Sequence, residues 1–159
     1  MAQDQSAERF RFLYRQAEGV IDRRAWRRAS LPLVAIAFLL TAIWLAIAPS
    51  GPRDLAREAF FDPIVVATHV YFVVYSFALI LCAVAEYFVS AKRFADRGKP
   101  PALAGLAPFS LLLAGAAHWL QPRSEGAMPE GLAYAFDAVA LAIVAWNVIE
   151  LGFAGSRRP

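Results

Sequence analysis

Long runs of apolar residues, separated by short polar segments, set the organisation of this chain. Each of four runs is long enough to cross the hydrocarbon core of a bilayer as a helix, which takes about 20 residues. The runs cover residues 31–48, 63–91, 102–121 and 132–153. Asp62 followed by Pro63 has the sequence of a helix start, with the aspartate as N-cap. The pattern predicts an all-α integral membrane protein, a bundle of four transmembrane helices.

The segment before the first run is polar overall but carries apolar residues at helical spacing. These residues are Phe10, Leu13, Tyr14, Ala17, Val20 and Ile21, with arginines and acidic residues between them. The spacing predicts an amphipathic helix on the cytoplasmic surface of the membrane. A solvated arm that docks on another subunit is the alternative. We therefore expect an N-terminal arm (1–30), a four-helix transmembrane domain (31–153), a cytoplasmic tail (154–159) and no cleavable signal peptide.

Composition and charge support a membrane location and predict an orientation. Hydrophobic residues make up 59% of the 159 positions, too many for an ordinary soluble domain. Most arginines and lysines lie in the N-terminal arm, in the loop between the second and third runs, and in the tail, whereas the other two loops hold only Arg53, Arg57 and Arg123. Because cytoplasmic loops are enriched in basic residues, both termini are expected to be cytoplasmic in a bacterial-type inner (plasma) membrane. The expected partners are other membrane subunits and lipids, not nucleic acid.

Five ionisable side chains lie inside the apolar runs, where a charge is costly and usually faces the bundle interior or a partner. They are His69, Glu86, His118, Asp137 and Glu150. Glu86 and Glu150 fall close to the cytoplasmic interface and are interpreted as interface residues. There they can reach water, Lys92 or Arg93.

His69 and His118 are the only histidines of the chain and fall at similar depth. With helix centres near Phe77 and Leu111, a rise of 1.5 Å per residue places them about 12 Å and about 10 Å toward the outer side. Two facing imidazoles at one depth are the minimal axial ligand set of heme b. A chlorophyll-type tetrapyrrole needs only one histidine per pigment. His69 and His118 are therefore candidate tetrapyrrole ligands.

Asp137 falls in the same leaflet and could orient one imidazole through a hydrogen bond. A metal site made by Asp137 with the two histidines is a weaker alternative. The alternative is that both histidines have structural roles, bonding headgroups, water or a neighbouring helix.

The fourth run has two contrasting faces. One is a stripe of small residues, which lets helices approach closely. It consists of Ala135, Ala138, Ala142 and Ala145. Asp137 aligns instead with the bulky Leu141, Val144 and Val148. Either a partner protein covers that face, or a rotation of the helix buries Asp137 against the histidine-bearing helices.

The sequence contains no grouping typical of a free-standing enzyme. It has no nucleophile–base set, no glycine-rich phosphate loop and only one cysteine, Cys82. The first functional hypothesis is a non-catalytic accessory or anchor subunit of a larger respiratory, photosynthetic or transport complex, which the chain resembles in architecture alone. The alternative is a small b-type cytochrome or tetrapyrrole-binding electron-transfer subunit with His69 and His118 as axial ligands. An assembly factor or lipid-binding protein comes third.

Overall fold

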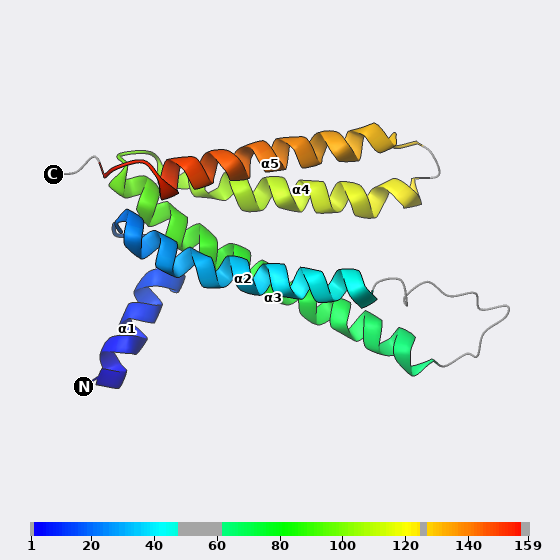
Figure 1. Ribbon diagram of the computed structural model, residues 1–159, viewed down its shortest axis with the longest axis horizontal. Helices are drawn as coiled ribbons and strands as arrows, with labels where there is room; N and C mark the ends of the chain where they lie inside the picture. Colours follow the sequence, from blue (N-terminus) through cyan, green and yellow to red (C-terminus); the bar gives the residue numbers. More distant parts are fainter. Residues whose placement is uncertain (1, 48–61, 125–126, 157–159) are drawn as a thin grey trace. The chain divides into compact units, whose positions relative to one another are not determined.

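The computed structural model describes residues 2–47, 62–124 and 127–156, and over these residues the chain is helical with no strand (Figure 1). The elements are α1 (Ala2–Arg15), α2 (Arg23–Ile47), α3 (Pro63–Asp96), η2 (Pro101–Gly105), α4 (Leu106–Leu120), η3 (Gln121–Arg123) and α5 (Glu130–Gly152). Four segments are long and apolar enough to cross a membrane, namely α2, α3, Pro101–Arg123 and α5. The predicted all-α fold with four transmembrane helices is confirmed, whereas the loop arginines Arg53 and Arg57 and the tail arginines Arg157 and Arg158 lie outside the described residues.

The N-terminal helix is shorter than the apolar spacing predicted. α1 ends at Arg15, so that Ala17, Val20 and Ile21 follow it in a non-helical segment. Gly19 has φ +105°, which an α-helix cannot contain. A Cβ at Gly19 would lie 2.7 Å from Cε2 of Phe12, so the backbone there passes close to the aromatic ring. The prediction of one amphipathic helix through residue 21 is wrong because the chain turns at this glycine.

The second helix begins well before the predicted start at residue 31. Asp22 acts as its N-cap, since Oδ1 accepts a hydrogen bond from the Ala25 amide at 2.6 Å. The arginines that follow are good helix formers, so the helix extends through a polar segment into the apolar run. The hydrophobic pattern predicts only the apolar part of α2, from residue 31 onward, and misses its polar first turns.

The two ends of α3 have clear local causes. The Ile64 amide donates to Oδ1 of Asp62 at 2.8 Å, which confirms the predicted N-cap. At the other end Gly98 has φ +67°, and the Lys99 amide donates to the Phe94 carbonyl at 2.9 Å. This is a Schellman motif with glycine in the left-handed conformation.

The chain forms two compact units, Met1–Ser30 with Val84–Pro159 and Leu31–Ala83. In the second unit the hydroxyl of Tyr71 donates to the Leu40 carbonyl at 2.7 Å, and the hydroxyls of Thr41 and Tyr75 lie 3.2 Å apart. The Trp44 ring also packs against the Tyr75 ring. These contacts join α2 to α3 by hydrogen bonds between helices, which are favourable where water is absent.

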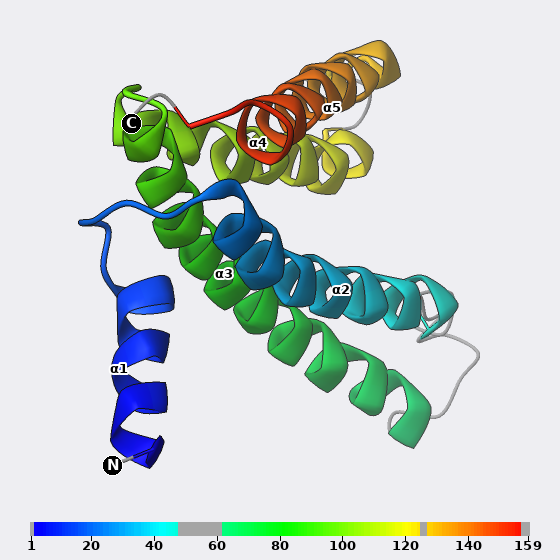
Figure 2. The same cartoon turned by 60° about the vertical axis from the view of Figure 1, so that its left-hand side comes forward.

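In the first unit α4 and α5 lie side by side (Figures 1 and 2). Small residues dominate the buried positions on both helices and allow the backbones to approach closely. The buried residues are Ser110, Ala114 and Ala117 on α4, and Ala133, Ala140, Asn147, Leu151 and Gly152 on α5. The unit also holds an apolar core, which joins Leu151 of α5 to residues of the other elements: Ile21, Trp26, Ala29, Val89, Ala91, Phe94 and Ala104.

Candidate functional site

His118 and Asp137 are brought together by the packing of α4 on α5. Nε2 of His118 lies 2.7 Å from Oδ2 of Asp137, with the two side chains 53% and 45% exposed. Asp137 is thus turned toward a histidine-bearing helix. No other part of the chain covers the pair completely, and about half of each side chain stays exposed. The ionisable pair lies on segments that are apolar enough to cross a membrane.

His69 has a partner on its own helix. Its Nδ1 lies 2.8 Å from the Val65 carbonyl, one turn earlier on α3. A neutral imidazole that donates from Nδ1 keeps its lone pair on Nε2, the nitrogen that is then free to bind a metal. His69 belongs to the second unit and His118 to the first, and each imidazole is oriented within its own unit.

The donor set fits a tetrapyrrole better at His69 than at His118. Asp137 occupies Nε2 of His118, which leaves Nδ1, the nitrogen adjacent to Cβ and therefore the more crowded one. Among the residues that the structure describes, no group of three or more histidine, cysteine, aspartate or glutamate side chains is arranged to hold a metal ion.

A second polar cluster surrounds the C-terminal end of α5. Four arginines donate to consecutive carbonyls there, and we call them the arginine clamp. Arg23 donates to the carbonyl of Phe153 at 3.3 Å, and Arg27 donates to that of Gly152 at 2.5 Å. Arg93 donates to the carbonyls of Leu151 at 3.0 Å and Ala154 at 2.5 Å, and Arg97 donates to that of Gly155. The last carbonyls of a helix lack internal partners and carry partial negative charge, so cations stabilise them.

Arg93 and Lys92 are fully buried, with none of their surface exposed. Arg93 also contacts Asp96 and Ser156, at the centre of the clamp. The sequence placed both residues in the loop between the second and third spans; instead they belong to α3 and donate to internal carbonyls.

Lys92 holds α1 in place. Its ammonium group donates to the carbonyls of Leu13, at 3.1 Å, and of Gln16, near the end of α1. The Tyr14 hydroxyl donates to the Ala29 carbonyl at 3.2 Å. Burial raises the pKa of Tyr14 and the nearby Glu86 carboxylate adds to this, so that the hydroxyl remains a donor. α1 is therefore tied to the first unit by its last turn.

The two glutamates have other partners than expected. Glu150 pairs with Lys99 at 2.8 Å and with Arg97 at 3.1 Å. Oε1 of Glu86 accepts hydrogen bonds from Ser90 at 2.8 Å and Ser30 at 3.0 Å. Neither pairs with Lys92 or Arg93.

A sequence signal for this network exists in the spacing of polar residues along α3. Glu86, Ser90, Arg93 and Arg97 recur every three to four positions and so share one helix face. Buried oxygens without a partner among the described residues are Oε2 of Glu86 and Oδ1 of Asn147.

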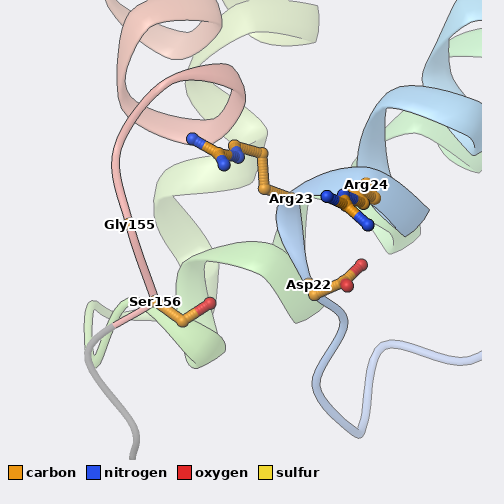
Figure 3. Close-up of a pocket in the computed structure, with 5 residues that line it drawn as sticks. All are labelled: Asp22, Arg23, Arg24, Gly155 and Ser156. Carbon is orange, nitrogen blue, oxygen red and sulfur yellow. The ribbon is translucent and has the colours of Figure 1, made fainter.

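A shallow cavity of about 210 Å³ lies beside the arginine clamp. Figure 3 shows that Asp22, Arg23 and Arg24 border it from the start of α2, and Gly155 and Ser156 from the segment after α5. Its charged lining can attract an anion, whereas the imidazoles described above can bind a metal centre. Comparison of the chain with protein-family models, curated proteins and solved structures found no match.

Proposed function

We propose that the protein is a non-catalytic accessory or anchor subunit of a larger membrane complex of the respiratory, photosynthetic or transport type. The observation that carries this proposal is the orientation of the small-residue stripe of α5. Its four members Ala135, Ala138, Ala142 and Ala145 are all exposed, while α5 contacts α4 through a different face. The stripe is thus a close-packing surface that is not used between α4 and α5.

Membrane physics explains why such a face suits a partner helix. Apolar side chains gain little by leaving lipid for a neighbouring helix, so association depends on close packing, which small residues permit. The half-exposed His118–Asp137 pair on the same two helices supports the proposal, since lipid solvates ionisable groups poorly. A partner subunit that also covers the face of α5 on which Asp137 lies would shield the pair.

The proposed subunit resides in a bacterial-type inner membrane with both termini on the cytoplasmic side. Support comes from the distribution of arginines and lysines, which are concentrated in the N-terminal arm and between the second and third spans. Arg93 and Lys92 are buried near the end of α3, so Arg97 and Lys99 are the basic residues of the connection that follows this helix.

Site-specific crosslinking tests the subunit proposal. A photo-crosslinking amino acid at Ala138, on the exposed stripe, is expected to capture one membrane protein that co-purifies with the wild type at fixed stoichiometry in mild detergent. The same amino acid at Ala116, an exposed alanine of α4 off the stripe, is the matched control. Ala138→Leu should reduce recovery of this partner at least tenfold, because a larger side chain separates the helices. Equal recovery with Ala138→Leu and Ala116→Leu, or a wild type that purifies alone, would refute the proposal.

A second candidate function is electron transfer with a bound tetrapyrrole, and the orientation of His69 favours it. The contact between Nδ1 and the Val65 carbonyl leaves Nε2 available as an axial ligand. His118 is the second ligand of this hypothesis and would have to bind through Nδ1, because its Nε2 contacts Asp137 at 2.7 Å. When bound, the tetrapyrrole would supply the one-electron chemistry, and the chain would supply the ligands and exclude water.

Visible spectroscopy of the protein purified from its native membrane tests this second candidate. A Soret band is expected in the wild type, with its loss in His69→Ala and in His118→Ala. Ser76→Ala, which removes a polar group of α3 bonded only to its own helix, should leave the band unchanged. A colourless wild-type protein would exclude this function while leaving the subunit proposal intact.

A further inference from the structure

We propose that the cavity beside the arginine clamp binds a phosphate group, supplied by the headgroup of an acidic phospholipid or by a soluble phosphate compound. This site is independent of the proposed function. It is lined by Asp22, Arg23, Arg24, Gly155 and Ser156 (Figure 3). Two of its three ionisable lining residues are cationic.

Among the described residues, two arginines and one carboxylate line the cavity, so its lining carries a net positive charge. Asp22 is engaged through Oδ1 as the N-cap of α2. The two other carboxylates of this region pair elsewhere, Asp96 with Arg93 and Glu150 with Arg97 and Lys99. Within the described parts of the chain, Arg24 has no ion pair or hydrogen bond, and the guanidinium of Arg23 makes a single contact of 3.3 Å with the Phe153 carbonyl.

The guanidinium groups that line the cavity suit an oxyanion such as phosphate. A guanidinium presents several N–H groups in a planar fork that matches two phosphate oxygens at once. Both arginines stand in the first turn of α2, where free backbone amides and the helix dipole add to the attraction for negative charge. The N-terminus of the helix contributes to the site, but the cavity defines it together with Arg24, which has no partner among the described residues, and Arg23, which donates only to Phe153.

The position of the cavity along the chain favours a lipid as the source. From Arg24 the helix continues into the apolar part of α2, and α5 reaches the same cluster from its own apolar segment. The cavity therefore lies where candidate spans end, at the level of phospholipid headgroups. Basic pockets of this kind at the ends of membrane helices bind anionic headgroups.

Retention of lipid by the purified protein tests the site. The protein is taken from vesicles of phosphatidylglycerol and phosphatidylcholine into mild detergent, and bound lipid is counted by mass spectrometry of the intact protein. The wild type should retain phosphatidylglycerol in preference to phosphatidylcholine. The double variant Arg23→Gln/Arg24→Gln should lower this preference by about 30-fold. Arg24→Gln alone removes no contact within the chain and should lower it as well. The pair Arg9→Gln and Arg11→Gln on α1, both exposed, removes equal charge and should have little effect.

Inorganic phosphate, compared with chloride at equal ionic strength, distinguishes the two sources. If phosphate displaces the retained lipid, the site accepts soluble phosphate compounds; if it does not, the site requires a lipid. Equal retention by the wild type and Arg23→Gln/Arg24→Gln would overturn the proposal. So would an equal loss in the α1 control pair, because the attraction would then be a diffuse effect of net charge.

Discussion

Replacement of Arg93 by alanine is expected to lower the free energy of unfolding by about 3–5 kcal/mol, the range found when one partner of a buried ion pair is removed. Arg93 is fully buried and bonds two carbonyls at the end of α5 as well as Asp96. Its loss leaves these acceptors without a donor and Asp96 without its counter-charge. Thermal or denaturant unfolding of the protein in detergent, followed by circular dichroism, measures the effect.

Two further substitutions make the test of Arg93 specific. Arg28→Ala removes an exposed arginine of α2 and should change stability by no more than about 0.5 kcal/mol. Arg93→Lys keeps the charge but lacks the fork that reaches Leu151 and Ala154 together, so it should recover only part of the loss. If Arg93→Ala unfolds like Arg28→Ala, the clamp does not stabilise the fold.

Trp26→Ala is expected to cost about 3–5 kcal/mol, the usual loss when a large buried aromatic ring is truncated. The ring is 8% exposed and belongs to the core of the first unit. It lies against Gly152, where an added Cβ would come within 3.2 Å of the ring atom Cζ3. The same unfolding experiment measures the loss.

Trp26→Phe separates packing from hydrogen bonding at this position. The indole Nε1 donates to the Ser90 hydroxyl at 3.1 Å, and Ser90 keeps its bond to Glu86 when the indole is absent. In Trp26→Phe, loss of the hydrogen bond should therefore lower the free energy of unfolding by only about 1 kcal/mol, in addition to the loss caused by the smaller ring. Trp119→Ala, at a ring 53% exposed on α4, is the control for tryptophan removal. A loss for Trp26→Ala no greater than that for Trp119→Ala would contradict the packing role of Trp26.

The four spans could be predicted from sequence because the bilayer imposes a length and an apolar composition on each one. The start of α2 could not, since Arg23 to Ser30 form a polar segment whose helical state depends on the Asp22 cap. The segment after α1 is non-helical and contains Gly19 at φ +105°, a conformation that the periodicity of apolar residues does not encode.

The candidate sites show the same division between local and distant causes. Sequence indicated that Asp137 and His118 share a leaflet, but their contact depends on the rotation of α5 that buries Ala133 and Ala140. The polar spacing along α3 indicates a shared face for Arg93, but it does not identify its carbonyl acceptors, which lie 58 to 61 positions away in the chain. The small-residue stripe could be recognised in the sequence. That it is exposed could be seen only from the way α5 packs on α4.

The arginine clamp has a consequence for the order in which the protein assembles. Arg27 and its acceptor Gly152 are separated by 125 positions, so the start of α2 leaves the ribosome long before its partner is synthesised. The first unit therefore closes only after the last helix has been made and inserted. Until then its basic side chains must remain hydrated or be covered by another protein. A nascent chain halted before residue 151 should accordingly be bound by insertion factors or degraded by quality-control proteases.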